Sequence, residues 1–445
     1  MFDRLWRFLD DRLGASRFTR RAVDKSFPDH FSFMLGEIAL YAFLVLVLTG
    51  VYLAMFFEAS TQQVTYNGSY SPLRGQTMSA AYASAVHLSF DVRFGLLMRQ
   101  IHHWAALVFL AAILAHLCRV FFTGAFRRPR EINWMVGVTL LVLALINGFA
   151  GYSLLDDLLS GTGLRVAFSL VESVPLVGSW LAIGLFGGNF PGRIIPRLFI
   201  VHVLIVPAAI AGLLSIHLAI VWRQKHTQFR GPGRRENNVV GSQLWPTYMA
   251  KSISLFFGVS AVLTLMGGLF QINPIWLYGP YRPSAVTIAS QPDWYMGWTE
   301  GALRLMPPWE IRALGYQLPN PFFPGVLLPG VTFAVLYLWP FLERRFTGDH
   351  AEHHLLDRPR DRPVRTAIGS AALAFYAVLF VAGSSDVIAH TFHFSINTII
   401  WVLRTALLVI PPLVGWVAWR VCRDLASERP LESLPSAPEP VSVDS

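Results

Sequence analysis

Two apolar stretches carry the clearest pattern in the sequence: IHHWAALVFLAAILAHLCRVFF over Ile101–Phe122 and LFIVHVLIVPAAIAGLLSIHLAIVW over Leu198–Trp222. Each is long enough to cross a lipid bilayer as a helix. Each also carries two histidines, fourteen residues apart in the first stretch and fifteen in the second. The four residues are His102, His116, His202 and His217.

The spacing of these histidines predicts their positions on the helices. At about 100° and 1.5 Å per residue, the two histidines of a stretch lie within roughly 40–60° of one face and about 21–22 Å apart along the axis. Two such helices side by side would offer one His–His pair near each membrane surface. Haem iron takes two axial ligands and neutral imidazole suits it, so the pattern predicts one haem clamped near each surface. A proton relay or a helix–helix hydrogen bond is the alternative for a single intramembrane histidine, but four at matched heights favour ligands.

His103 follows His102 but lies about 100° round the helix, with no partner at a matching height, so we expect it not to be a ligand. No C-x-x-C-H motif occurs in the chain. Covalent c-type attachment requires that motif. We therefore expect two non-covalent b-type haems.

The composition, 54% hydrophobic and 14% charged over 445 residues, is that of a polytopic membrane protein. It predicts an all-α fold with eight transmembrane helices, four of them forming a di-haem bundle, and surface helices in the outer loops. The predicted spans are 33–57, 101–122, 134–152, 198–222, 252–271, 325–342, 367–383 and 396–419.

The basic residues predict the orientation of these spans. Counted over the loops and ends, 26 Lys and Arg lie on the side of the N-terminus and 8 on the other side. Positive charge collects on the cytoplasmic side, so we expect both termini in the cytoplasm of a bacterial cell. Topology and anionic membrane lipid thus account for the net charge of +9, and no nucleic-acid partner is expected.

Four glycines repeat the fourteen-residue period on two other spans. They are Gly36, Gly50, Gly137 and Gly151. One such glycine is most often a helix-packing device. Here, however, two pairs of glycines repeat the spacing of the histidines. This predicts helix faces without Cβ atoms, against which a flat macrocycle could lie. Arg99 and Arg119 stand one turn beyond a histidine toward each surface, where they would pair with haem propionates; snorkelling at the interface is the alternative.

The segments 152–197 and 272–323 are too long for tight connections and are predicted to form surface or re-entrant helices on the outer face. The second contains Gln291-Pro292-Asp293-Trp294-Tyr295, followed by Trp298, Thr299 and Glu300. Asp293 and Glu300 would share one face if this stretch were helical. Carboxylates beside aromatic residues near a haem would suit removal of protons from a quinol, whereas a solvated loop is the alternative.

These features together resemble cytochrome b of the respiratory cytochrome bc complex (complex III), over residues 25–425. The resemblance rests on the paired histidines, the four spaced glycines, Gly151-Tyr152, and Pro292-Asp293-Trp294-Tyr295 in place of the family's Pro-Glu-Trp-Tyr. The runs Gln100–Trp104 and Thr123–Glu131 are similar to actinobacterial members, which oxidise menaquinol. The resemblance implies a homodimeric complex with a Rieske iron–sulfur protein and a di-haem cytochrome c, and an association with a terminal oxidase.

The resemblance also implies roles for individual residues. His102 and His202 would hold the low-potential haem near the outer site, and His116 and His217 the high-potential haem near the inner site. Asp293, Tyr295 and Glu300 would be catalytic. The outer quinol site would comprise Tyr152, Gly163, Pro292, Asp293, Trp294, Tyr295, Thr299 and Glu300, and the inner quinone site Trp222, His226, Lys251 and Ser252.

The chain departs from the family pattern in three further places. Leu155-Asp156-Asp157 stands where the family has Pro-Trp-Gly, and Lys251-Ser252 stands where the mitochondrial type has Lys-Asp. Trp222 stands where the mitochondrial type has an inner-site histidine, for which His226 is the candidate substitute. The resemblance therefore does not identify the inner proton donor.

The expected domains are a cytoplasmic amphipathic segment (1–30), a di-haem domain (31–230), a C-terminal domain with the quinol-oxidation loop (231–425) and a disordered tail (426–445).

Two other functions fit part of the pattern: a di-haem anchor of another quinone-linked oxidoreductase, and a haem-free proton-coupled transporter. The histidine-rich run with His350, His353 and His354 has the composition of a metal cluster, but it lies among arginines and is interpreted as a solvated cytoplasmic loop.

Overall fold

The structure is a computed structural model that describes residues 2–188, 190–285, 291–313 and 315–427. Within this part of the chain, eight helices are long and apolar enough to cross a membrane, which confirms the predicted number. They span Phe31–Ala54, Gly95–Phe122, Glu131–Ser153, Ile194–Gln224, Leu244–Leu269, Phe323–Thr347, Pro363–Gly383 and Ile396–Ala426. Several extend beyond the predicted runs, because helical hydrogen bonding continues into polar residues such as Arg99 and Gln100.

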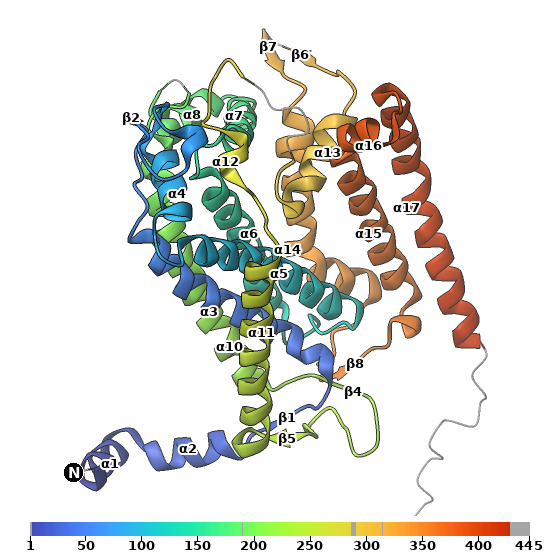
Figure 1. The fold of residues 1–445 in the computed structure, drawn as a ribbon. Coiled ribbons are helices and arrows are strands. Elements are labelled where there is room, and N and C mark those ends of the chain that lie inside the picture. Colours follow the sequence, from blue (N-terminus) through green and yellow to red (C-terminus); the bar gives the residue numbers. More distant parts are fainter. Residues whose placement is uncertain (1, 189, 286–290, 314, 428–445) are drawn as a thin grey trace, which may run out of the picture.

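The spanning helices carry eight of the helix labels in Figure 1. These are α3 (Met34–Ala54), α5 (Gly95–Phe122), α6 (Glu131–Ser153), α10 (Val206–Gln224), α11 (Met249–Leu269), α14 (Leu328–Thr347), α15 (Pro363–Gly383) and α17 (Ile396–Ser427). The shorter helices are α1 (Phe2–Leu13), α2 (Ala15–Val23), α4 (Ala80–Phe90), α7 (Leu158–Glu172), α8 (Gly178–Phe186), α9 (Ile194–Ile200), α12 (Ile275–Tyr278), α13 (Gly297–Leu305) and α16 (Ser385–Phe392).

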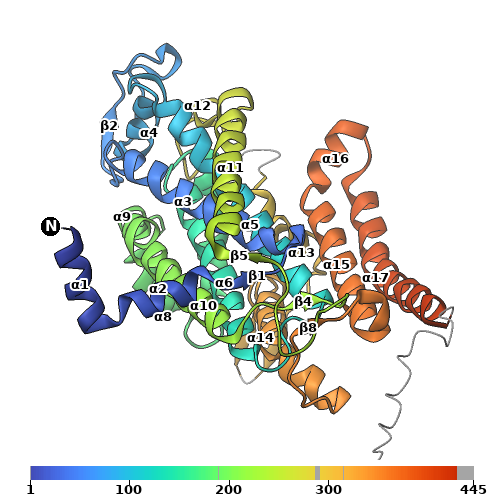
Figure 2. The ribbon, with the colours of Figure 1, turned by 90° about the horizontal axis from the view of Figure 1, so that it is seen from below.

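Helices α3, α5, α6 and α10 pack together as one bundle, with α11 against α3 and α5. A second group stands beside it, in which α15 packs against α13 and α17 (Figure 1). Figure 2 shows the same separation of α15, α16 and α17 from α3 and α10 when the molecule is seen from below. The bundle has two distinct ends: α4, α7, α8 and α12 lie at one, here called the loop end, and α1 and α2 lie at the other, here called the terminal end (Figure 1).

A π-turn at Val201–Ile205 joins α9 to α10 and contains His202. The Val206 N–H donates to the Val201 carbonyl, five residues back, directly before Pro207. Proline has no N–H and its ring displaces the preceding turn, which favours the wider hydrogen bonding. The extra residue in this turn offsets the fifteen-residue spacing of His202 and His217, so that it matches the fourteen-residue spacing on α5.

The two long outer connections form helices, as predicted, and they bind one another. The Leu158 N–H donates to the Gly279 carbonyl at 2.9 Å, and the Tyr281 N–H donates to the Asp156 carbonyl at 3.0 Å. Asp157 is fully buried and caps α7 by accepting from the N–H of Leu159 at 2.9 Å. Burial raises the pKa of the neighbouring Asp156 to about 6.

The described residues also contain four two-stranded pairs that were not predicted from the sequence. They are β1 (Ser26–Phe27) with β5 (Ser242–Gln243), β2 (Gln63–Thr65) with β3 (Thr77–Ser79), β4 (Gln228–Phe229) with β8 (Leu355–Leu356), and β6 (Ile311–Ala313) with β7 (Tyr316–Leu318). The first and third pairs fasten together loops at the terminal end. Residues 426 and 427 of the predicted disordered tail (426–445) belong to the end of α17, and the tail from residue 428 onward lies outside the described residues.

The histidine-rich loop that contains His350, His353 and His354 is held at the terminal end by hydrogen bonds from Arg130, which is buried. Its guanidinium donates to the carbonyl of His353 at 2.7 Å and contacts Nδ1 of His354 at 2.9 Å. It also donates to the carbonyl of Lys225 at 3.0 Å, beyond the end of α10. Among the described residues, no group of three or more His, Cys, Asp or Glu is placed to hold a metal ion.

Candidate functional site

The bundle brings its four histidines together as two pairs. The rings of His102 and His202 have centroids 6.1 Å apart at the loop end, and those of His116 and His217 have centroids 6.5 Å apart at the terminal end. Imidazole–metal bonds are about 2 Å long. Two such bonds and the half-widths of two rings add up to roughly this separation, so each pair has room for one ligated metal between its rings.

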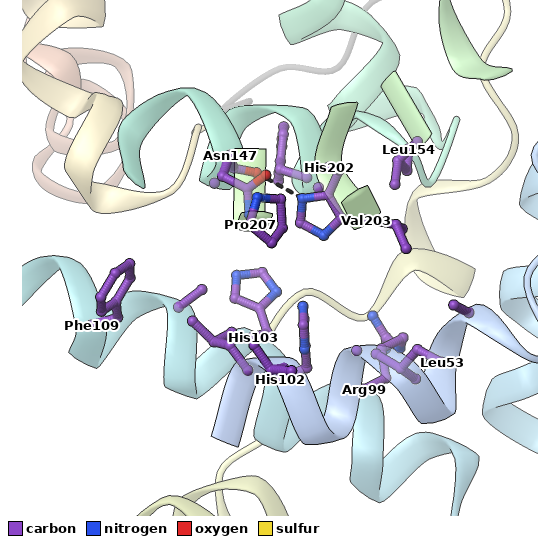
Figure 3. Close-up of a pocket in the computed structure, with 18 of the residues that line it drawn as sticks. Leu53, Arg99, His102, His103, Phe109, Asn147, Leu154, His202, Val203 and Pro207 are labelled. Carbon is purple, nitrogen blue, oxygen red and sulfur yellow. Dashed lines mark hydrogen bonds between the residues drawn. The ribbon is translucent and has the colours of Figure 1, made fainter. Parts of the chain in front are cut away.

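The hydrogen bonds of the loop-end pair fix which ring nitrogen faces inward. Nδ1 of His102 lies 2.9 Å from the Thr49 hydroxyl, and Nδ1 of His202 donates to the Asn147 carbonyl at 2.9 Å (Figure 3). A ligating histidine uses its second nitrogen in this way, which orients the ring. Nε2 of each ring is thereby left for a metal. At the terminal end, Nδ1 of His116 is buried without a hydrogen-bond partner among the described residues.

Each of the four spaced glycines faces one histidine ring. A Cβ atom on Gly50 would lie 3.2 Å from Cε1 of His102, and one on Gly151 would lie 2.4 Å from Cε1 of His202. At the other level, a Cβ atom on Gly36 would lie 3.3 Å from Cε1 of His116, and one on Gly137 would lie 3.6 Å from Cε1 of His217. These distances show that the backbone of α3 and α6 lies against the ligand-bearing faces, and that Gly151 has the least space for a side chain.

Two arginines flank the pairs, Arg99 buried and Arg119 partly buried. Arg99 donates to the Asn273 carbonyl at 3.1 Å, but its Nε and Nη2 atoms have no partner among the described residues. Nε and Nη2 of Arg119 likewise lack one, and this guanidinium lies 4.1 Å from the Phe33 ring. A buried cation without a partner is costly. Each arginine could therefore donate its free N–H groups to an anionic ligand. The propionates of haem are anionic groups of this kind.

A cavity of about 250 Å³ extends from the loop-end pair. Figure 3 shows His102, His103, Arg99 and His202 around it. The predicted site residues that line it are Gly50, Arg99, His102, Gly151, Tyr152, His202, Asp293 and Tyr295.

Asp293 accepts two hydrogen bonds at the edge of this cavity. Nε2 of His103 lies 2.8 Å from its Oδ1, and the Tyr295 hydroxyl donates to Oδ2 at 3.2 Å. The side chains of His103 and Asp293 are only 15% and 17% exposed, so the contact is largely shielded from solvent. Burial, and then the Asp293 carboxylate, raises the pKa of Tyr295, which keeps its hydroxyl a neutral donor. No role for His103 was predicted from the sequence; its place next to His102 on the helix was the available signal.

Glu300 occupies a different environment. It forms an ion pair with Arg304 at 2.9 Å, and Arg304 also donates to Asp386 at 3.2 Å. The expectation that Asp293 and Glu300 share a helix face is wrong. Asp293 has extended backbone and precedes the 3₁₀ turn Trp294–Met296, so the helical period does not reach it.

The other predicted outer residues lie near these groups. The Trp294 ring has its centroid 6.1 Å from that of Tyr295, and Pro292 directly precedes Asp293. Thr299 is buried in α13. Gly163 lies in α7, where a Cβ atom would be 3.6 Å from the Tyr152 ring.

At the terminal end, two of the four predicted inner residues surround Phe27 and its neighbour Tyr248, whose rings stack 4.3 Å apart. Phe27 lies 4.6 Å from the His226 ring and 6.3 Å from the Trp222 ring. Burial, followed by the charge of nearby Lys25, lowers the pKa of His226 to about 4 and so keeps it neutral.

The other two predicted inner residues differ in environment. Ser252 donates to Glu37 at 2.6 Å, whereas Lys251 is half-exposed and forms an ion pair with Asp29 at 2.7 Å. Glu37, Tyr41 and Tyr248 were not predicted to belong to this region; the only signal in the sequence was an acidic residue beside Gly36 in an apolar run.

Comparisons with known proteins agree with this geometry. Residues 107–280 match the family described as Cytochrome b(N-terminal)/b6/petB. The chain is 56% identical to the cytochrome bc1 complex cytochrome b subunit of Mycobacterium tuberculosis, over 93% of this chain and 76% of the relative. It is 50% identical to the subunit of the same name from Streptomyces coelicolor, over 95% and 78%.

A solved structure of a hyperthermophilic respiratory complex III contains a chain that superposes with a TM-score of 0.68 at 19% identity. The match covers 93% of this chain and 99% of the other, so the two share the fold. The family also explains the composition of the site, since haem b is its cofactor. The chain belongs to the family of cytochrome b subunits of the cytochrome bc1 complex, a quinol–cytochrome c oxidoreductase.

Proposed function

We propose that this subunit oxidises menaquinol at the loop end and reduces quinone at the terminal end, with electrons crossing the bundle through two non-covalent b haems and with coupled proton translocation (a Q cycle). The observation that carries the proposal is the pair of matched histidine levels at opposite ends of one bundle, each with facing glycines and an arginine whose Nε and Nη2 atoms have no partner among the described residues.

Each haem has its own set of residues under this proposal. His102 and His202, with Gly50, Gly151 and Arg99, would hold the haem at the loop end. His116 and His217, with Gly36, Gly137 and Arg119, would hold the other. Haem, when bound, supplies one-electron transfer.

The chain's own residues handle the protons of the quinol. Asp293 is the proposed base, because it lines the loop-end cavity and a carboxylate can take a proton from a quinol hydroxyl. Tyr295 and His103 orient its two oxygens through their hydrogen bonds. Glu300, paired with Arg304, is the second candidate and would act further from the cavity. Tyr152, Gly163, Pro292, Trp294 and Thr299 complete the proposed quinol site.

The proposed setting follows from the charge pattern and the family. Both termini lie in the bacterial cytoplasm, and the loop end faces outward. The proposed partners are a Rieske iron–sulfur protein, a di-haem cytochrome c, a second copy of the complex and a terminal oxidase. The proposed domains are 1–30, 31–230, 231–425 and 426–445, as the sequence predicts.

A reduced-minus-oxidised spectrum of the purified complex tests the proposal directly. We expect two b-type components that titrate separately, and we expect menaquinol to reduce both. A single b-type component, or two components that menaquinol does not reduce, would contradict the proposal.

The glycine contacts predict unequal effects at the two levels. Gly151→Ala should remove or weaken the loop-end haem, because its Cβ would lie 2.4 Å from the His202 ring. Gly137→Ala is the matched control on the same helix, since its Cβ would make an ordinary 3.6 Å contact with His217. Haem content per chain, measured as the pyridine haemochrome, should fall toward one in the first variant and stay at two in the second. Equal haem content in both variants would show that Gly151 serves helix packing alone.

A further inference from the structure

The first spanning helix holds a carboxylate at the terminal end of the bundle that three hydroxyl groups surround. Glu37 of α3 accepts from Ser252 at 2.6 Å and from Tyr41 at 3.3 Å, and the Tyr248 hydroxyl donates to its other oxygen. Tyr41 and Ser252 are also hydrogen-bonded to each other. All four side chains are partly buried, and they join α3 to the start of the fifth span.

The charges around Glu37 make this arrangement unusual for a structural contact. Among the described residues no Lys or Arg forms an ion pair with Glu37. Lys251, next to Ser252, forms its ion pair with Asp29 instead, at 2.7 Å. An ionisable side chain within a membrane span is costly and is a functional candidate by default. Hydroxyl groups both donate and accept. The same three neighbours can therefore hold Glu37 as a carboxylate or as a carboxylic acid without any chain movement.

The surroundings of Glu37 suit a flat, redox-active ring. A Cβ atom on Gly36, the preceding residue, would lie 3.3 Å from the His116 ring, so Glu37 follows on α3 at the level of the terminal-end pair. Tyr248 stacks on Phe27, and Phe27 also packs on His226 at 4.6 Å. Aromatic faces and a hydrogen-bonding carboxyl group thus occur together beside the electron carrier that the proposed function places on His116 and His217.

We infer that Glu37 is the proton donor for quinone reduction at the terminal end, and that Tyr41, Tyr248 and Ser252 position it; this rests on the proposed function. A quinone takes two electrons from the terminal-end haem and two protons, one on each oxygen, and becomes a quinol. Glu37 as a carboxylic acid breaks its O–H bond and gives one proton to a quinone oxygen. It is reprotonated from cytoplasmic water through the hydroxyl groups around it, and the second oxygen, on the opposite side of the ring, takes its proton from cytoplasmic water.

The test is the reoxidation of the b haems in the intact complex carrying Glu37→Gln. Loop-end oxidation supplies the electrons, so menaquinol should still reduce the b haems as in the wild type. Reoxidation by menaquinone should slow by about 10²-fold, the lower end of the loss expected when a general acid is removed, and reduced b haem should accumulate during turnover. Glu37→Asp keeps a carboxyl group and should recover part of the rate.

Two further measurements separate this role from a packing role. Glu352→Gln removes an exposed carboxylate at the same end and should reoxidise as the wild type does, because Glu352 pairs with Arg128 at 3.7 Å and not with a residue of the proposed inner site. Infrared difference spectra between reduced and oxidised complex should show a carboxyl signal that is lost in Glu37→Gln and retained in Glu352→Gln. Wild-type reoxidation in Glu37→Gln, or a persistent carboxyl signal, would overturn the inference. An absence of menaquinol-driven b haem reduction in the wild type would instead overturn the proposed function.

Discussion

Asp293→Asn is expected to slow menaquinol–cytochrome c reductase turnover by about 10²-fold, the lower range for loss of a general base. The amide cannot take a proton from the quinol, although it keeps the size of the side chain and can still accept from Tyr295 and contact His103. The haem content should not change, because Asp293 contacts His103 and not a proposed ligand. Steady-state assays across pH, with the haem spectrum as a control for assembly, measure both quantities.

Glu300→Gln separates the two candidate bases. Its carboxylate pairs with Arg304 and does not line the described part of the cavity. We expect a smaller loss of turnover than for Asp293→Asn, arising through the Arg304–Asp386 contact. If the double variant kept the turnover and the pH dependence of the wild type, the proton would leave the quinol by another route and the assignment of Asp293 would be wrong.

His102→Leu is expected to remove the loop-end haem and to abolish electron transfer across the bundle, while the terminal-end haem stays bound. The reason is geometric: the two pairs are separated by about 21 Å of helix rise, so neither shares a ligand with the other. Haem content should fall from two to one, with loss of one component from the redox titration.

His116→Leu is the matched variant at the other level and should remove the other component. Loss of both haems from either variant, in a complex that still assembles, would contradict the presence of two independent levels.

The histidine and glycine pattern was predictable because the geometry of a helix alone relates the residues within each span. The fourteen-residue spacing on each span, together with the assumption that the two spans are neighbours, was enough to predict that Gly50 and His102 lie at the same level. The sequence also predicted the spans themselves, since length and hydropathy decide them.

The hydrogen-bonded groups could not be predicted in the same way. His103 and Asp293 are 190 residues apart, and Glu37 and Ser252 are 215 apart. Their contacts depend on how α5 meets the 3₁₀ turn and how α3 meets α11, which no local period encodes. The assumed helix through Asp293 failed for a related reason: Pro292 and an extended backbone precede the turn, so the helix begins later.

If the two histidine pairs hold the proposed haems, their separation makes electron transfer between them sensitive to the electrical potential across the membrane. About 21 Å of rise is roughly two thirds of a hydrocarbon layer of about 30 Å. A potential of about 100 mV acts on a unit charge with about 2.3 kcal/mol over the full thickness. In the proposed orientation, an inside-negative potential of that size therefore opposes each electron that moves from the loop end to the terminal end by about 1.5 kcal/mol. That energy changes the equilibrium between the two levels by about tenfold, so an energised membrane would hold electrons back on the loop-end pair.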